Sequence, residues 1–187
     1  MPSPGLGVMG AAIARHIGSA GHELTVYNRS AARLDAWREA NPAIPARIAH
    51  SPEDAAEGAD MVITCVGNDD DLADVVLGPN GVFKSLRKGG VFVDHTTVSA
   101  RIARQISVEA RDLEIHCVDA PMTGSQIGAE SGTLTLMCGG RNSAVEAARP
   151  VMETYSRRIV HVGKAGAGQT AKMANQICIA GIVASLA

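Results

Sequence analysis

Short apolar segments rich in β-branched residues alternate with amphipathic segments along almost the whole of this 187-residue sequence. The apolar segments predict strands at residues 23–27, 61–66, 91–94, 114–118, 133–138 and 158–162. The segments between them predict helices at residues 11–20, 31–40, 52–57, 69–77, 100–112, 143–155 and 167–187. Strands that alternate with helices are typical of a parallel sheet with crossover helices on both faces. The pattern therefore predicts a doubly wound α/β fold with a mainly parallel sheet.

A glycine-rich segment stands directly before the first predicted helix and reads Gly5-Leu6-Gly7-Val8-Met9-Gly10. In a G-x-G-x-x-G loop the glycines permit a tight turn, close approach of a pyrophosphate and close helix packing, and the helix N-terminus stabilises the anion. A predicted strand ends about 20 residues further on, where a bound ribose would be read. We interpret residues 1–163 as a Rossmann-type dinucleotide-binding domain, the alternative being a structural glycine turn.

Both ends of the sequence are unusual for such a domain. Only Met1-Pro2-Ser3-Pro4 precedes the glycine loop, at the place where a dinucleotide fold has its first strand. Two prolines exclude a central strand there because proline lacks the N–H that a sheet requires. Either the first strand is missing or another segment takes its place. The last predicted helix is still running at residue 187, so we expect the sequence to end inside a helix.

The residues after the second predicted strand indicate which dinucleotide is bound. An acidic side chain at this position would bind a ribose 2′-hydroxyl and repel a 2′-phosphate. This sequence instead has Asn28, Arg29 and Ser30, with Arg33 one turn later. Two guanidinium groups and a hydroxyl favour NADP, with NAD as the second possibility. The alternative is that both arginines are solvated residues at the start of a helix.

A lysine near the other end of the sequence is the candidate acid/base. Lys172 follows the glycine-rich start of the last predicted helix, and Asn175 and Gln176 lie three and four residues beyond it, on the same helical face. The following turns are apolar, and both desolvation and the helix N-terminus would lower the pKa of the amine, as suits general acid/base catalysis. The alternative is an ordinary solvated lysine.

The segment from Val118 to Ser125 ends a predicted strand with a small, hydroxyl-bearing turn, and such a turn offers backbone N–H groups to a carboxylate. Within it, Asp119 either stabilises the loop or takes part in chemistry, and a purely structural turn is equally compatible with the sequence. Residues 128–134 read as a turn that leads into a strand.

Composition narrows the class of partner. The formal net charge of −2 and the 3% aromatic content supply neither a basic surface nor stacking side chains for nucleic acid. The four cysteines form no C-x-x-C pair, which predicts reduced cysteines in a cytoplasmic protein and no metal site. No signal peptide is recognisable, and the apolar residues 177–187 fall short of the roughly 20 needed to span a membrane.

Six segments together resemble the β-hydroxyacid dehydrogenase family, which shares the NAD-binding domain of 6-phosphogluconate dehydrogenase and includes 3-hydroxyisobutyrate dehydrogenase, tartronate semialdehyde reductase and glyoxylate/succinic semialdehyde reductase. They are the glycine loop, Ala20-Gly21-His22, Asn28-Arg29-Ser30, Asp119-Ala120-Pro121-Met122-Thr123-Gly124, Gly132-Thr133-Leu134 with Met137-Cys138-Gly139-Gly140, and residues 166–176. Their order and spacing match over nearly the whole chain.

The resemblance implies reversible hydride transfer between a nicotinamide and the alcohol or aldehyde carbon of a small 3-hydroxy acid. Lys172 corresponds to the catalytic lysine of the family, Asn175 and Gln176 would orient the substrate, and Thr123, Gly124 and Ser125 would hold its carboxylate. Cofactor contacts carried over are the glycine loop, Arg29, the loop of Cys65, Val66 and Gly67, and Thr97. Related imine reductases share the architecture without this lysine.

Three departures from the family pattern bear on function. The family has serine, glycine, glycine where this chain has Thr123, Gly124 and Ser125, which leaves the substrate open. Family members also carry a first strand and a C-terminal all-α domain that closes the site and supplies much of a homo-oligomer interface, and we expect this chain to lack both. The resemblance implies that residues 164–187 are the start of the interdomain helix. A truncated, non-catalytic nucleotide-binding or interaction module is therefore the rival interpretation.

Overall fold

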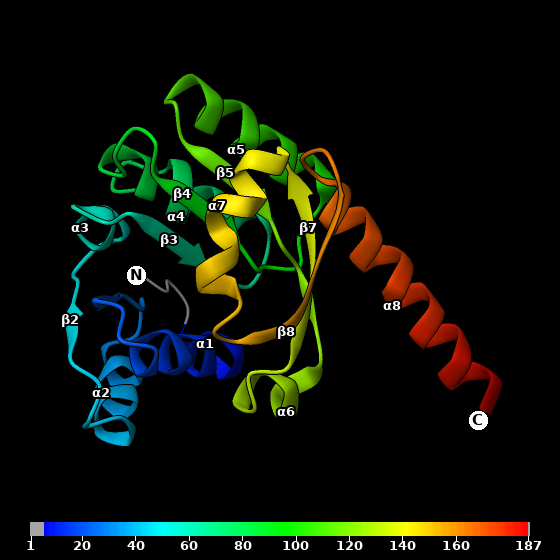
Figure 1. The fold of residues 1–187 in the computed structure, drawn as a ribbon, viewed down its shortest axis with the longest axis horizontal. Helices are drawn as coiled ribbons and strands as arrows, with labels where there is room; N and C mark the ends of the chain where they lie inside the picture. Colours follow the sequence, from blue (N-terminus) through cyan, green and yellow to red (C-terminus); the bar gives the residue numbers. More distant parts are fainter. Residues whose placement is uncertain (1–5, 187) are drawn as a thin grey trace.

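The computed structural model describes residues 6–186 (Figure 1). The helices are α1 (Val8–Ser19), α2 (Ala31–Ala40), α3 (Pro52–Ala56), α4 (Asp69–Leu77), α5 (Ala100–Asp112), α6 (Ser125–Glu130), α7 (Asn142–Met152), α8 (Ala167–Leu186) and the 3-10 turn η1 (Val82–Lys84). The strands are β1 (Leu24–Val26), β2 (Ala46–Ile48), β3 (Met61–Thr64), β4 (Val91–Asp94), β5 (His116–Asp119), β6 (Met122–Thr123), β7 (Leu134–Gly140) and β8 (Ser156–Gly163). The predicted α/β class is confirmed. Gly5 and the region expected to lack a first strand lie outside the described residues.

Strand pairing divides the described residues into two sheets. β1 and β2 form a parallel pair, and the larger sheet has the order β3-β4-β5-β7-β6 with β8 paired to β7. β3, β4 and β5 are parallel, β7 runs antiparallel to β5 and β6, and β8 is parallel to β7. The sheet is therefore mainly parallel at the β3 edge and mixed around β7.

Helices cover both faces of the larger sheet, as a doubly wound fold requires. Every residue of β3 and β4 is buried. Neighbours along a strand point to opposite faces, so Ile63 and Val93 join the apolar cluster that includes α1 and α7, whereas Val62 and Phe92 join the cluster that includes α4 and α5. These two layers are visible in Figure 1. Because β3 and β4 are parallel, their carboxyl ends lie at the same edge of the larger sheet, together with the polar residues that follow them.

Local sequence explains where several helices begin. Ser51 accepts a hydrogen bond from the backbone N–H of Asp54 at 3.0 Å, and Pro52 occupies the first helical position of α3, as predicted. Asn68 caps α4 and Ser99 caps α5 in the same way. α5 carries a buried stripe of Ile102, Ala103, Ile106 and Ala110, which fixes it on the sheet.

The structure corrects the interpretation of residues 128–134 as a turn that leads into a strand. Residues 125–130 form the short helix α6, and β7 begins only at Leu134. β2 and β6 are also additional to the predicted strands. All three elements are short, with six, three and two residues, so none holds enough residues to display a period of 3.6 or 2.

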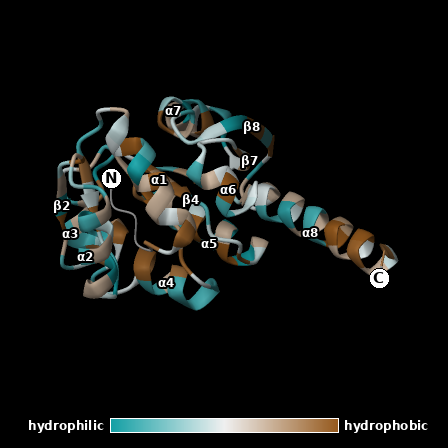
Figure 2. Ribbon diagram, turned by 90° about the horizontal axis from the view of Figure 1, so that it is seen from below, coloured by the Kyte–Doolittle hydropathy of each residue, from teal (hydrophilic) through white to brown (hydrophobic). Residues whose placement is uncertain are grey.

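The last helix, α8, leaves the domain and projects away from it (Figures 1 and 2). Its first turns pack on β7, β8 and α5, whereas its distal half exposes apolar side chains, including Ile177, Ile182, Val183 and Leu186. Over residues 6–186, no helix combines the length and apolarity that crossing a membrane requires.

Candidate cofactor and active site

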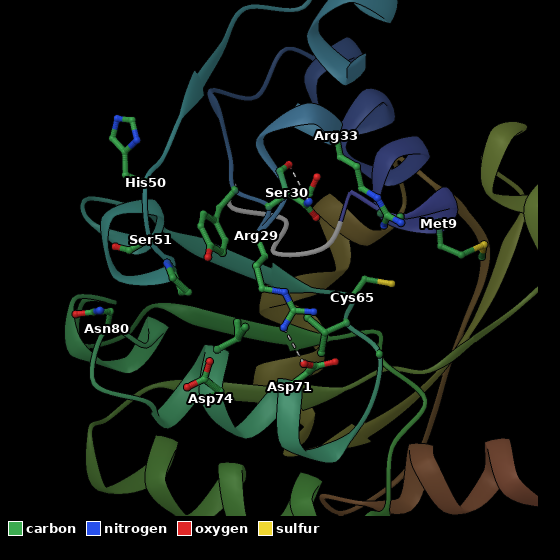
Figure 3. A pocket seen from close by; sticks show the side chains of 18 of the residues that line it. Met9, Arg29, Ser30, Arg33, His50, Ser51, Cys65, Asp71, Asp74 and Asn80 are labelled. Atoms are coloured by element: carbon green, nitrogen blue, oxygen red, sulfur yellow. Dashed lines mark hydrogen bonds and ion pairs between the residues drawn. The ribbon is translucent and has the colours of Figure 1, made fainter. Parts of the chain in front are cut away.

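A cleft of about 810 Å³ lies where the starts of α1 and α2 meet the loops that follow β1 and β3 (Figure 3). Its volume falls within the range of small-molecule and cofactor sites. The predicted cofactor residues that line it are Gly7, Val8, Met9, Gly10, Asn28, Arg29, Ser30, Arg33, Cys65, Val66 and Gly67. Three segments that are distant in sequence thus converge on one cavity. Leu6 and Thr97 are not among its lining residues.

The start of α1 is suited to an anion. Gly7 is the N-cap, and within residues 6–186 no side chain caps this helix and no acidic residue lies in its first turn. The first backbone N–H groups of an α-helix have no partner inside the helix, and they attract negative charge. Those of Val8, Met9 and Gly10 border the cleft. This end of the cleft therefore fits the pyrophosphate of a dinucleotide.

Asn28, which the sequence placed among the cofactor-reading residues, also has a structural role. Its Oδ1 accepts a hydrogen bond from the backbone N–H of Leu6 at 3.0 Å, and its Nδ2 donates to the carbonyl of Ser30 at 3.1 Å. The side chain thereby ties the glycine loop to the segment after β1. Leu6 itself is buried, so it anchors the loop rather than facing the cleft.

Two cations reach into the cleft from the segment after β1. The Arg29 guanidinium extends across it to Asp71, with 3.3 Å between Nη1 and Oδ1 (Figure 3), and the Arg29 side chain is 87% exposed. A Cβ placed on Gly7 would lie 4.0 Å from Arg33 Nη1, which sets Arg33 beside the glycine loop. An ion pair this exposed contributes less than about 1 kcal/mol, so Arg29 is free to turn toward a bound phosphate.

The start of α4, on the opposite wall of the cleft, is electrostatically unsuited to an anion. Asn68 caps it, and Asp69, Asp70 and Asp71 fill its first turn. The Asn68 side chain also donates to Asp71 Oδ2 at 3.0 Å. Carboxylates and a satisfied cap disfavour an anion here. The electrostatics of the cleft therefore direct a phosphate toward α1, Arg29 and Arg33.

The candidate acid/base lies on α8. Lys172 is buried, with 8% of its surface exposed, and burial lowers the pKa of its amine. Asn175, one turn further on, is half-buried, and among the described residues its buried Oδ1 has no hydrogen-bond partner. Gln176 is exposed. The Lys172 amine is therefore desolvated, although neither Lys172 nor Asn175 lines the cleft.

The predicted carboxylate turn joins β6 to α6. Thr123 is half-buried and pairs with Thr135 of β7, while Gly124 and Ser125 are exposed. Gly124 has φ +135° and Ser125 has φ +57°, so the second residue holds a left-handed conformation without being glycine. Because α8 packs on β7 as well, the turn and the lysine helix border the same strand.

Asp119 stabilises the start of α8. Its Oδ1 accepts from the backbone N–H of Gly166 at 2.8 Å, and its Oδ2 accepts from the N–H of Gln169 at 3.1 Å. Burial raises the pKa of the carboxyl, and these backbone donors oppose that rise. Of the two roles left open by the sequence, the hydrogen bonds support the structural one.

Sequence reasoning missed several residues at these sites. Asp71, Asp74, His50, Ser51 and Asn80 line the cleft, and Gln169 is fully buried at the start of α8. Asp71 stood in an acidic run that reads as a solvated helix start. For Gln169 the only signal was its place directly after Gly168, one turn before the lysine.

The sequence matches the family described as the NAD binding domain of 6-phosphogluconate dehydrogenase over residues 4–163. The chain belongs to this family. The resemblance to the N-terminal domain of the β-hydroxyacid dehydrogenases is thereby confirmed, and so is a nicotinamide dinucleotide as the cofactor.

Individual proteins of known sequence or structure are also similar to this chain. The chain is 49% identical to an uncharacterized oxidoreductase of Shewanella frigidimarina, covering 98% of this chain and 62% of that protein. It is 36% identical to the NAD-dependent L-serine dehydrogenase of Pseudomonas aeruginosa, covering 94% of this chain and 58% of that protein. The structure of Mycobacterium tuberculosis 3-hydroxyisobutyrate dehydrogenase with L-serine superimposes with a TM-score of 0.86 at 31% identity, covering 96% of this chain and 59% of that one. The chain thus spans about three fifths of the length of the relatives it matches.

Proposed function

We propose that this protein transfers a hydride between NADP(H) and a small 3-hydroxy acid or its semialdehyde, with Lys172 as general acid and base. The observation that carries the proposal is the buried Lys172 amine, whose pKa is lowered by burial, on a helix that starts at the sheet bearing the cofactor loops. An amine with a lowered pKa can donate a proton to a nascent alkoxide and take one back during oxidation.

The cofactor would lie with its pyrophosphate at the start of α1 and its 2′-phosphate between Arg29, Ser30 and Arg33. The loop of Cys65, Val66 and Gly67 and the exposed Thr97 would border the remainder of the dinucleotide. When bound, the nicotinamide supplies or accepts the hydride. NADP is preferred over NAD because two cations and no carboxylate stand immediately after β1.

The substrate would be a small carboxylate. Thr123, Gly124 and Ser125 would hold its carboxylate, while Asn175 and Gln176 would orient its oxygen beside Lys172. The names of the relatives suggest L-serine and 3-hydroxyisobutyrate among the candidates. We further propose residues 1–163 as the nucleotide-binding unit, residues 164–187 as the interdomain helix, a cytoplasmic location and a homo-oligomer.

A turnover assay with matched lysine variants tests the proposal. NADPH oxidation is followed with glyoxylate, succinic semialdehyde, tartronate semialdehyde and methylmalonate semialdehyde, and NADP⁺ reduction with L-serine. Removing a general acid/base lowers the rate by about 10²- to 10⁴-fold, so we expect Lys172→Met to reduce kcat by that factor while NADPH still binds. Lys164→Met removes an exposed lysine eight residues earlier and serves as the control, with kcat within about twofold of the wild type.

The same assay addresses the rival interpretation. A protein that binds NADPH but turns over none of these substrates would be a nucleotide-binding module. Turnover that survives Lys172→Met would refute the acid/base role.

A further inference from the structure

The start of α8 is joined to the sheet by a buried polar junction, which we define as Asp94, Thr96, Asp119 and Gln169. Asp119 binds the backbone of Gly166 and Gln169, as described above, and is 4% exposed. These bonds fix the first turn of α8 on the end of β5. The position of the helix axis is therefore set by the sheet and not by the exposed distal half.

Gln169 carries the junction across to the loop after β4. Its Nε2 donates to the carbonyl of Thr96 at 2.7 Å, and its Oε1 accepts from the backbone N–H of Val98 at 3.1 Å. The side chain is fully buried, and both ends of its amide are used. Together the two bonds bracket Thr97, the exposed residue between them. A side-chain amide thus holds the loop as a neighbouring strand would.

Thr96 extends the same connection to a loop that lines the cleft. Its Oγ1 accepts from the backbone N–H of Val66 at 3.0 Å and donates to Asp94 Oδ1 at 2.6 Å. Val66 belongs to the loop after β3 that borders the cofactor cleft. A continuous set of hydrogen bonds therefore runs from that loop through Thr96 to Gln169 and α8.

Lys172 lies three residues after Gln169, so both side chains occupy one face of α8, and both are buried. Loss of the Gln169 side-chain bonds would remove the hydrogen bonds that join this face to the loop after β4. We propose that Gln169 is a positioning residue that holds the Lys172 amine at a fixed distance from the cofactor loops after β3 and β4. The inference rests on the proposed function, since the distance matters only if Lys172 acts on a substrate beside the cofactor.

The first experiment compares polar deletions on neighbouring residues of one helix. Gln169→Met keeps the volume and loses both bonds to the loop, whereas Thr170→Val loses one bond, from its hydroxyl to the carbonyl of Gly166. A misplacement of about 1 Å costs on the order of 10²-fold in rate. We therefore expect Gln169→Met to lower kcat by about 10- to 100-fold, with the Kd of NADPH changed less than about threefold, and Thr170→Val to stay near the wild type.

The second measurement follows Lys172 directly and does not require turnover. Acetic anhydride acylates free amines, and mass spectrometry gives the rate at Lys172 relative to the exposed Lys164. We expect this ratio to rise several-fold in Gln169→Met and to stay unchanged in Thr170→Val. If folded Gln169→Met keeps the wild-type ratio, the positioning role is refuted, whether or not the wild type is active. If the wild type has no turnover but the ratio rises, the proposed function fails while the mechanical link stands.

A third variant keeps the proposal testable if the methionine variant does not fold. Gln169→Glu can still accept from the N–H of Val98, but it can donate to the Thr96 carbonyl only when protonated. Burial raises the pKa of a carboxyl. We expect kcat of this variant, relative to the wild type, to recover as the pH falls. A ratio that is flat with pH, or that falls with it, would overturn the assigned role of the Thr96 bond.

Discussion

The cofactor cleft and the buried polar junction differ in whether their polar groups have partners within the protein. In the cleft the helix start at Gly7 is uncapped by any described side chain, and Arg29 is largely exposed with one weak partner. In the junction Asp119 and Gln169 are buried, and every polar atom of both side chains is used. Groups that lack protein partners are available to a ligand, whereas groups that have them hold geometry. Substitutions in the cleft should therefore change affinity, and those in the junction should change stability and rate.

Gly168→Ala should produce the largest change in stability. A Cβ there would lie 2.3 Å from the carbonyl oxygen of Met137 and 2.6 Å from that of Asp119, and neither backbone atom can move aside. We expect a loss of about 3 kcal/mol in the free energy of unfolding, measured by urea denaturation. Gly181→Ala on the same helix meets no atom within 4 Å and should gain up to about 1 kcal/mol. Equal stabilities for the two variants would show that α8 does not pack closely at its base.

Asp94 and His95 should have opposed effects on the pH dependence of stability. Burial raises the pKa of Asp94 to about 7 and lowers that of His95 to about 4. Between pH 4 and pH 6.5 the folded state therefore holds a proton on Asp94 that the unfolded state releases, and it lacks one on His95 that the unfolded state binds. Asp94 makes stability fall as the pH rises through this window, His95 makes it rise, and in the wild type the two slopes oppose each other.

Single substitutions separate the two slopes. Asp94→Asn should leave stability rising with pH, and His95→Gln should leave it falling, each by at most about 1.4 kcal/mol per pH unit between pH 4 and 6.5. Urea denaturation across this range provides the measurement. Identical slopes in both variants would contradict the assignment of the buried groups.

The cleft arginines should affect affinity without affecting stability. Arg29→Ala combined with Arg33→Ala removes two charge-assisted contacts to a 2′-phosphate, so we expect the Kd of NADPH to rise at least about tenfold and that of NADH to change much less. The free energy of unfolding should stay within about 0.5 kcal/mol, because both residues line the cleft and are exposed. Fluorescence titration with the two cofactors measures the ratio. Equal losses for NADPH and NADH would rule out a 2′-phosphate site here.

Ser125→Gly should produce the smallest effect. Ser125 holds φ +57° at the predicted carboxylate turn, a conformation that costs a non-glycine residue about 1 kcal/mol. Relief of that strain should raise stability by less than about 1 kcal/mol, offset by the greater freedom of glycine when unfolded. Thermal unfolding is the measurement, and the control is Ser131→Gly, the C-cap of the same short helix at φ −90°. The control relieves no strain, and it loses the hydrogen bond from the Ser131 hydroxyl to the carbonyl of Ile127. A larger gain in the control would show that the turn is not strained.

The sequence predicted the long elements and missed those defined by tertiary contacts. α4 and α5 match their predicted ranges because each combines a capping residue with helical periodicity. β2 has only three residues and exists through its pairing with β1, which no local pattern shows. α6 was missed because Gly124 and Ser125, with positive φ, have the composition of a turn.

The residues of the candidate site also separate into those predictable from the local sequence and those brought together only by folding. The glycine loop and the segment after β1 were predictable because their chemistry is local, and the structure brings both to one cleft. Gln169 was not predictable, since its partner Thr96 is 73 residues away and only folding brings them together. The environment of Lys172 was predicted from the apolar turns that follow it, although most of those side chains are exposed. Its burial comes from the base of α8 instead, where the helix packs on β7, β8 and α5.

α8 is one continuous helix that is held at its base by Asp119, so a tilt about this base would move its far end more than its first turns. At a rise of about 1.5 Å per residue, Lys172 stands about 7.5 Å from the first residue of the helix and Leu186 about 28 Å. If the helix tilts about its base, the amine travels roughly a quarter as far as the tip. A swing of about 2 Å at the tip would displace Lys172 by only about 0.5 Å, which is the tolerance a catalytic group requires. The far end of the helix can thus move while the lysine stays in register with the cofactor loops.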